Sequence, residues 1–273
     1  MNGDSNTGVE MVVFDWAGTT VDYASSAPAE VFERVFKAAG VELTLKEING
    51  PMGMEKKAHI RALLSLERAQ EQWKRKYERS WNEDDVERLY ESFEDNLEAI
   101  VESRSIPIEG VVDTVNEIRR MGIKIGSTTG YNERIMKRVE PVAKSYGYEV
   151  DCIITPDATG SARPAPFMIF ECMRRMNVYP ASKVVKVGDT IVDIKEGKNA
   201  GAWSIGILTG SNLLGLSKND VENLSREELK VLKKEAMDKY LAAGADMVID
   251  TINELPKVIG MINQIIMNKR EGK

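Results

Sequence analysis

The sequence predicts an α/β fold, in which a Rossmann-like core built on a parallel sheet carries an inserted all-helical cap domain. The first observation is that apolar, strand-like runs alternate with helical patterns beyond residue 107, which is typical of parallel strands joined by right-handed crossovers. The second is that one earlier strand, Met11–Phe14, is followed by a long segment with helical patterns only. A lone buried strand would leave its backbone groups unpaired, so we expect it to join the same sheet.

The segment after the first strand is predicted to be a series of helices, because apolar residues recur there at helical spacing. Helices are expected over Pro28–Ala39, from near Glu55, around Trp73 and Tyr77, and over Asp84–Glu102. Residues 41–53 are expected to be a connection, broken at Asn49-Gly50-Pro51. The absence of any strand pattern indicates a separate helical unit.

The remaining chain alternates between the two patterns. Strands are expected over residues 123–129, 150–155, 183–188, 203–208 and 245–249, with helices such as Val111–Met121, Arg134–Tyr146 and Asp193–Ala200 between them. We therefore expect a catalytic core formed by residues 1–24 and 105–273, and a cap domain formed by residues 25–104.

Composition narrows the class of partner. The chain has 273 residues, of which 42% are hydrophobic, and a net charge of −6, so no broad basic surface is available for nucleic acid or anionic membranes. No apolar run approaches the roughly 20 residues that span a bilayer. The two cysteines are expected to be buried thiols in a reducing compartment, and the cytoplasm is the expected location.

Four predicted strand ends carry polar residues that suit one chemistry. Asp15 follows the first strand, Thr129 and Gly130 follow the next core strand, Arg163 precedes a helix expected to start at its proline, and Asp189 follows a later strand. Parallel strands bring their carboxyl ends to one edge, where ligands bind. An attacking acid, a hydroxyl-and-amide cradle, a cation and a metal-binding acid suit phosphoryl transfer with Mg²⁺. Taken singly, each of these residues also fits the role of a helix cap or of a solvated surface charge.

This layout resembles the haloacid dehalogenase superfamily, and the resemblance spans nearly the whole chain. It implies that Asp15 is the nucleophile, that Thr129, Gly130 and Arg163 bind phosphate, and that Asp189 binds the metal. Ala17 occupies the position where phosphatases of the superfamily usually have a second Asp, which protonates the leaving group. Its backbone carbonyl remains available to the metal beside Asp15 and Asp189.

The predicted cap offers a replacement for the missing acid. Lys56 and His59 lie three residues apart in Pro51-Met52-Gly53-Met54-Glu55-Lys56-Lys57-Ala58-His59, so they share one face at a helix start. A lysine amine in a low-dielectric cleft can lose its proton and attack a carbonyl. The resulting iminium would let a carbon–phosphorus bond break with an enamine as the leaving group.

The motifs Phe14-Asp15-Trp16-Ala17-Gly18-Thr19-Thr20-Val21-Asp22, Pro51-Met52-Gly53 with Lys56, Gly126-Ser127-Thr128-Thr129-Gly130-Tyr131 and Val187-Gly188-Asp189-Thr190 resemble those of the phosphonatase family, the phosphonoacetaldehyde hydrolases. The resemblance implies Mg²⁺-dependent hydrolysis of phosphonoacetaldehyde to acetaldehyde and phosphate. It further implies a Schiff base on Lys56, proton movement assisted by His59, a pocket lined by Met52 and Tyr131, and a homodimer.

Other functions fit parts of the pattern. A cap-bearing phosphatase acting on a small phosphorylated metabolite is disfavoured by Ala17, and a dehalogenase by the metal-binding Asp189. A metabolite-binding module that has lost its activity would have no reason to retain Asp15, Lys56 and Arg163 together. Without the resemblance, Lys56 would be read as a solvated helix charge and His59 as a structural residue.

Overall fold

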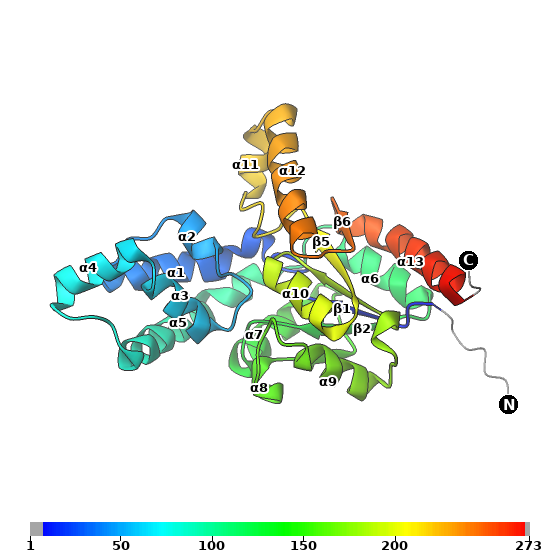
Figure 1. Cartoon of the computed structure of the whole chain (residues 1–273), viewed down its shortest axis with the longest axis horizontal. Helices are drawn as coiled ribbons and strands as arrows, with labels where there is room; N and C mark the ends of the chain where they lie inside the picture. Colours follow the sequence, from blue (N-terminus) through cyan, green and yellow to red (C-terminus); the bar gives the residue numbers. More distant parts are fainter. Residues whose placement is uncertain (1–7, 271–273) are drawn as a thin grey trace.

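A six-stranded parallel sheet forms the centre of the computed structural model, which describes residues 8–270 (Figure 1). The strand order is β3-β2-β1-β4-β5-β6. The strands are β1 (Met11–Phe14), β2 (Lys124–Thr128), β3 (Cys152–Ile154), β4 (Val184–Gly188), β5 (Trp203–Ile207) and β6 (Met247–Ile249). The predicted α/β class and the predicted parallel sheet are confirmed, including the assignment of Met11–Phe14 to the same sheet.

The register of the central strands decides where the functional residues lie. Phe14 pairs with Ser127 of β2 and with Val187 of β4, so these three strands end at nearly the same level. Their side chains alternate between the two faces of the sheet, and helices cover both faces. Val12 and Phe14 pack in one apolar core, whereas Met11 and Val13 pack in another.

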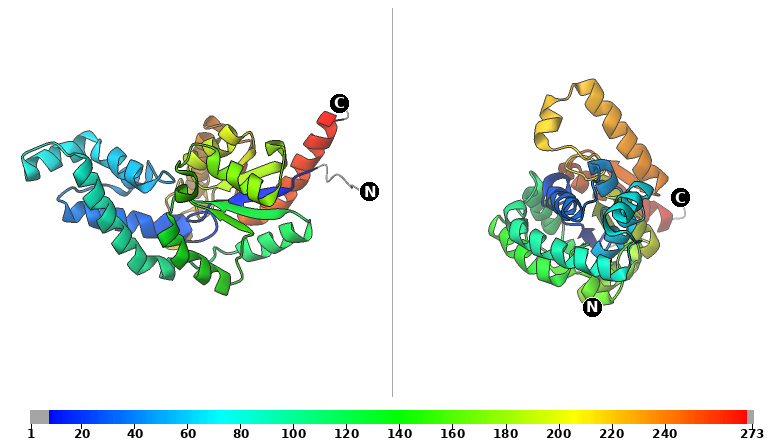
Figure 2. Two further views of the ribbon diagram at one scale, coloured as in Figure 1. Left: turned by 90° about the horizontal axis from the view of Figure 1, so that it is seen from below. Right: turned by 90° about the vertical axis from the view of Figure 1, so that its left-hand side faces the viewer.

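Helices from the second half of the chain cover the sheet (Figures 1 and 2). They are α6 (Val111–Arg120), α7 (Glu133–Ser145), α8 (Pro156–Thr159), α9 (Phe167–Met176), α10 (Ile191–Ala200), α11 (Lys218–Asn223), α12 (Arg226–Ala242) and α13 (Leu255–Arg270), with short 3-10 helices η2 (Ala181–Lys183) and η3 (Ile252–Glu254). A further 3-10 helix, η1 (Tyr23–Ser25), follows the loop after β1. No helix among residues 8–270 combines the length and hydropathy that crossing a membrane requires.

The segment between β1 and α6 is helical and lies beside the sheet, at the left of Figure 1. Its helices are α1 (Ser26–Ala38), α2 (Leu45–Asn49), α3 (Lys56–Leu64), α4 (Glu67–Tyr77) and α5 (Glu83–Arg104). Phe32, Phe93 and Trp73 are fully buried among them, and the rings of Phe32 and Phe93 stack with centroids 4.3 Å apart. This segment therefore buries aromatic residues of its own, away from the strands.

Two expectations for local structure were wrong. The connection over residues 41–53 contains helix α2, because Thr44 and Glu47 form a reciprocal capping box that starts a helix before the turn at Asn49. The helix expected directly after Arg163 begins only at Phe167. A helical pattern was expected between the strands at residues 203–208 and 245–249, and helices α11 and α12 lie there; α12 projects from the sheet in Figure 2, and only its Ala236 and Tyr240 are buried.

Candidate active site

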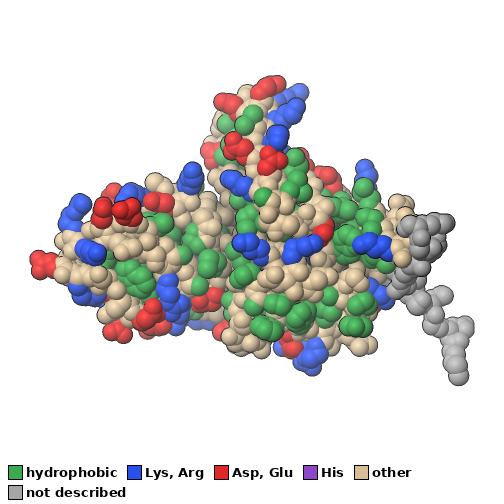
Figure 3. Space-filling model, in the orientation of Figure 1, with side chains coloured by type: hydrophobic (Ala, Val, Ile, Leu, Met, Phe, Trp, Pro, Cys, Tyr) green, Lys and Arg blue, Asp and Glu red, His purple; other side chains and the backbone are tan. Residues whose placement is uncertain are grey.

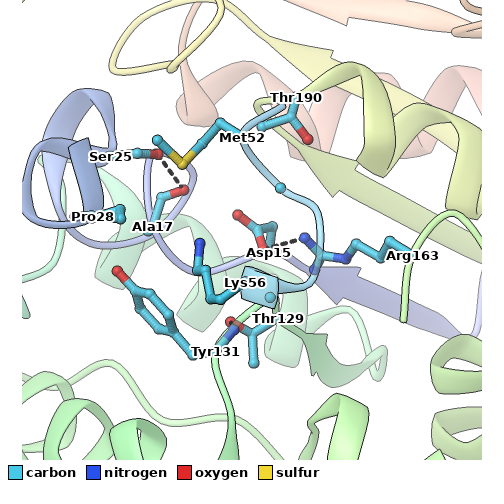
Figure 4. Close-up of a pocket in the computed structure, with 12 residues that line it drawn as sticks. Asp15, Ala17, Ser25, Pro28, Met52, Lys56, Thr129, Tyr131, Arg163 and Thr190 are labelled. Atoms are coloured by element: carbon cyan, nitrogen blue, oxygen red, sulfur yellow. Dashed lines mark hydrogen bonds and ion pairs between the residues drawn. The ribbon is translucent and has the colours of Figure 1, made fainter. Parts of the chain in front are cut away.

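The carboxyl edge of the sheet holds a small cavity. Asp15 follows β1, Thr129 follows β2, and Arg163 enters from the loop between α8 and α9. The helical segment supplies the opposite wall (Figure 4). The lining residues are Asp15, Ala17, Ser25, Pro28, Met52, Gly53, Lys56, Thr129, Gly130, Tyr131, Arg163 and Thr190. The structure thus brings most of the predicted site residues together, and it adds Ser25, Pro28 and Thr190.

Asp15 faces a buried guanidinium. Its Oδ1 lies 2.7 Å from Nη1 of Arg163, and the two side chains are 7% and 1% exposed. Burial raises the pKa of the Asp15 carboxyl, and the charge of Arg163 opposes that rise. The backbone N–H of Asp15 donates to the carbonyl of Val187, which fixes the start of the loop after β1.

Lys56 is buried although it is the first residue of helix α3. The helix starts there because the Glu55 carboxylate accepts hydrogen bonds from the N–H groups of Lys57 and Ala58. Within the described part of the chain, the Lys56 amine has no hydrogen-bond or ion-pair partner, and its Nζ lies 5.4 Å from the Tyr131 ring centroid. Desolvation lowers the pKa of Lys56 to about 8.

His59 lies behind this lysine and does not line the cavity. Its ring packs against Phe32, with centroids 4.0 Å apart, and its Nε2 lies 2.9 Å from the carbonyl of Ile48. That contact assigns the proton to Nε2 and leaves Nδ1 as a buried acceptor without a partner in residues 8–270. Burial and the neighbouring Lys56 hold the pKa of His59 well below its usual value, so the imidazole is neutral.

Three buried carboxylates form a candidate metal centre. Asp15, Asp189 and Asp193 each offer an oxygen within 4.8 Å of the others. Burial, and then Asp15 and Asp193, raise the pKa of Asp189 well above its usual value, which is the situation that a divalent cation would relieve. Arg163 contacts both Asp15 and Asp193, but Asp193 is also paired with Lys186, whereas Asp15 lines the cavity together with Ala17. Asp15, Asp189 and the Ala17 carbonyl thus remain the candidate ligands for a hard cation.

The loop after β1 approaches this centre too closely for a side chain. Gly18 has φ of 82°, and a Cβ there would lie 2.1 Å from Oδ2 of Asp189. Ser25 donates from Oγ to the carbonyl of Ala17, 3.1 Å away. These contacts hold the backbone between Asp15 and the helical segment against the carboxylates.

The loop before α3 closes the cavity from the other side. Gly53 has φ of 87°, and a Cβ there would lie 2.4 Å from Oγ1 of Thr190. A Cβ on Gly130 would lie 3.1 Å from the carbonyl of Met54. The Thr129 hydroxyl accepts from the N–H of Tyr131 at 3.0 Å, so the cradle after β2 is ordered where it meets Met52 and Gly53.

The cavity is small. Its volume is about 20 Å³, enough for about one water molecule. A second cavity of about 570 Å³ shares Lys56, Gly130 and Arg163 with it and is also lined by Tyr90 and Asp157. Lys56 and Arg163 therefore lie between the small cavity beside Asp15 and a larger neighbouring cavity.

Comparison with known proteins agrees with this geometry. Residues 9–201 match the family model of haloacid dehalogenase-like hydrolases. The chain is 46% identical to a phosphonoacetaldehyde hydrolase of Parabacteroides distasonis over 92% of this chain and 96% of that protein. It is 44% identical to one of Bacillus cytotoxicus, over 94% and 97% respectively.

Two solved structures are similar to this chain, one in both sequence and fold and the other in fold. A phosphonoacetaldehyde hydrolase-like protein from Oleispira antarctica superposes with a TM-score of 0.92 at 34% identity, covering 94% of each chain. β-Phosphoglucomutase from Clostridium difficile superposes with a TM-score of 0.67 at 14% identity, covering 95% of this chain and 99% of that one, and so shares the fold. This chain belongs to the phosphonoacetaldehyde hydrolase family of haloacid dehalogenase-like hydrolases.

Proposed function

We propose that this enzyme hydrolyses the carbon–phosphorus bond of phosphonoacetaldehyde, giving acetaldehyde and phosphate. The observation that carries the proposal is that Lys56 and Asp15 line one cavity (Figure 4). The loop after β1 has Ala17 where a phosphatase needs an acid. A substrate with a phosphonate and an aldehyde matches the two reactive groups, and the relatives carry this activity in their names.

The proposed reaction proceeds through two covalent intermediates, one on Lys56 and one on Asp15. The neutral Lys56 amine adds to the aldehyde, and the adduct takes up a proton and expels water, giving an iminium. The carbon–phosphorus bond then breaks, its electrons pass to the iminium to form an enamine, and the phosphoryl group bonds to the Asp15 carboxylate. Protonation of the enamine carbon and hydrolysis of the iminium release acetaldehyde. Water attacks the aspartyl phosphate to release phosphate and restore Asp15.

The other cavity residues support these steps. Arg163 offsets the charge of the phosphonate oxygens, and Thr129 with the Gly130 N–H binds them. Met52 and Tyr131 exclude water beside the amine. His59 Nδ1 is a neutral acceptor close to Lys56, which suits it to receive a proton through one water molecule.

The proposal includes Mg²⁺ held by Asp15, Asp189 and the Ala17 carbonyl. When bound, Mg²⁺ would supply charge stabilisation to the phosphoryl group. The chemistry of the donors supports it, since buried carboxylate and carbonyl oxygens are the ligands that this ion prefers.

Residues 25–104 act as a cap domain over a core of residues 1–24 and 105–273. The cavity is small and is lined by residues of both the core and the helical segment, which supports a cycle in which the cap opens to admit substrate and closes to exclude water from the iminium and the acyl phosphate. The alternative, a capped phosphatase of a small phosphorylated metabolite, would use Asp15 and Asp189 equally well and would have no need for Lys56.

The proposal also includes a homodimer in the cytoplasm. Phe167 and Phe170 of α9 are 52% and 40% exposed, and Tyr179 just beyond is 82% exposed. Hydrophobic side chains gather over this part of the molecule in Figure 3. Such an aromatic surface is typical of a subunit interface. The free thiols of Cys152 and Cys172 are consistent with a reducing compartment.

Replacement of Lys56 tests the proposed function. Lys56→Arg keeps a cation but cannot form an imine, so we expect no release of phosphate from phosphonoacetaldehyde and no borohydride-trapped adduct in peptide mass spectra. The matched control is Lys57→Arg, which alters a partly exposed neighbour paired with Glu87 and should leave both readouts unchanged. Near-normal turnover by Lys56→Arg would exclude the Schiff base.

The lowered pKa of Lys56 predicts a pH dependence. Desolvation disfavours the ammonium, so the folded pKa is about 8, and roughly a tenth of the amine is neutral at pH 7. The rate of reductive trapping by cyanoborohydride should rise with pH and level off above about pH 8. A rate that still rises tenfold per pH unit beyond pH 9.5 would show an ordinary lysine.

Metal removal tests the carboxylate centre. EDTA treatment should abolish phosphate release, and added Mg²⁺ should restore it and raise the Tm, because an ion that binds only the folded state stabilises that state. Asp189→Asn should lose both responses, whereas Asp84→Asn on the surface should keep them. Full activity after EDTA treatment and dialysis would contradict the metal proposal.

The aromatic surface predicts the oligomeric state. Light scattering after gel filtration should give the mass of a dimer, and Phe170→Asp should give that of a monomer because it places a charge in the buried interface. Tyr146→Asp, at an exposed aromatic residue at the end of α7, should remain a dimer. A monomeric parent protein, or a dimeric Phe170→Asp variant, would exclude this interface.

A further inference from the structure

Two buried ionisable residues have no part in the steps above. Lys186 lies in the middle of β4 and Glu196 lies on α10, and both are fully buried. Placing a lysine and a glutamate inside a protein is unfavourable unless both are fully paired. Their contacts lead directly to Arg163, which lies between them and Asp15.

The contacts form one network around a single hydroxyl. The Thr128 hydroxyl accepts hydrogen bonds from Nη2 of Arg163 and Nζ of Lys186, both at 2.8 Å. It donates to Oε2 of Glu196 at 3.0 Å. A hydroxyl has one donor and two acceptor positions, so Thr128 is saturated and its orientation is fixed.

Glu196 contacts both Arg163 and Lys186. Its Oε2 lies 3.0 Å from Nε of Arg163 and 3.1 Å from Nζ of Lys186. Lys186 also lies 3.0 Å from Oδ1 of Asp193, which in turn lies 2.8 Å from Nη1 of Arg163. Two cations and two carboxylates therefore balance in charge, and each contacts both of the opposite sign.

The network determines which way the guanidinium faces. Its Nη2 donates a hydrogen bond to Thr128, and carboxylate oxygens lie within ion-pair distance of the other two nitrogens: Glu196 beside Nε, and Asp193 and Asp15 beside Nη1. A planar guanidinium with one hydrogen bond and carboxylates beside its other two nitrogens has a strongly favoured orientation. Arg163 lies in the loop between α8 and α9. The orientation of its side chain therefore depends on contacts with residues of the sheet and of α10.

We propose that Glu196 and Lys186 are positioning residues, which act through Thr128 to hold Arg163 in the orientation that serves Asp15 and the phosphonate oxygens. The inference rests on the proposed function in taking Arg163 as the phosphate-binding cation. It predicts that neither residue contacts substrate, and that both are needed for affinity toward the phosphoryl group.

Calorimetric titration with inorganic phosphate in the presence of Mg²⁺ tests this without turnover. Glu196→Gln and Lys186→Met should each weaken phosphate binding by about tenfold, because each loosens hydrogen bonds to a charged group. The double variant should lose less than the sum of the two single losses, since both act on one contact. Lys195→Met, on an exposed position of α10, is the matched control and should bind like the parent protein.

Because Glu196 and Lys186 carry opposite charges, their variants distinguish the positioning of Arg163 from a general electrostatic effect on phosphate binding. If only net charge mattered, Glu196→Gln would tighten phosphate binding and Lys186→Met would weaken it. Opposite shifts, unchanged affinity with a lower Tm, or no phosphate binding by the parent protein would each overturn the proposal. Should the single variants fail to fold, Glu196→Asp keeps the charge with a shorter reach, and it should weaken phosphate binding while the Tm remains close to that of the parent.

Reductive trapping of acetaldehyde distinguishes this inference from the Schiff base. Acetaldehyde has no phosphoryl group, so trapping at Lys56 should be the same in Glu196→Gln as in the parent protein. Absence of trapping in the parent would contradict the Lys56 chemistry and leave the phosphate result to decide on Glu196. A trapping defect in Glu196→Gln would show that the variant disturbs the whole site, which counts against a specific effect on Arg163.

Discussion

The ion pair between Asp15 and Arg163 is the contact on which the site depends. Both side chains are buried at the carboxyl edge of the sheet, where neither charge is stable alone. Arg163 is in turn bound by Asp193 and Glu196. Asp189 is a fourth buried carboxylate beside Asp15 and Asp193, and among residues 8–270 it has no ion pair with Arg163 or Lys186, so the cluster carries excess negative charge when all four are ionised. A divalent cation would balance it, and this requirement links the metal site to the nucleophile.

The helical segment supplies what the sheet edge lacks. The core places a carboxylate, a cation and a phosphate cradle together, but Ala17 provides no proton for a leaving group. Lys56 enters from helix α3, and desolvation lowers its pKa to about 8, because the same closure that excludes water also disfavours the ammonium. The proposed closure of the cap would thus serve both halves of the proposed reaction: it would raise the neutral fraction of the amine, and it would remove water from the acyl phosphate.

Sequence reasoning located the residues whose positions follow from topology. Asp15, Thr129 and Asp189 come directly after strands, and parallel strands of matched register must bring them together. Lys56 could be tied to the site only through motif resemblance, because its distance from Asp15 depends on how the helical segment folds back. Lys186 was visible as a lysine in an apolar strand, yet its partner Glu196 lies on another element.

The secondary-structure elements also differ in how well the sequence predicts them. Strands were predictable because they are continuous apolar runs buried on both faces. Helix α2 was missed because its capping box precedes a strong turn signal and because only Ile48 of it is buried. The spacing of apolar residues in a sequence reflects which positions are buried, so a helix that buries few residues shows only a weak periodic pattern.

The central claim is that phosphoryl transfer to Asp15 requires an imine on Lys56. Acid quenching during turnover of phosphonoacetaldehyde, followed by mass spectrometry of the Asp15 peptide, measures this directly. The account predicts phosphorylated Asp15 in the parent enzyme and none in Lys56→Arg. Equal phosphorylation of Asp15 in both proteins would show that the two halves of the site act independently, and would contradict it.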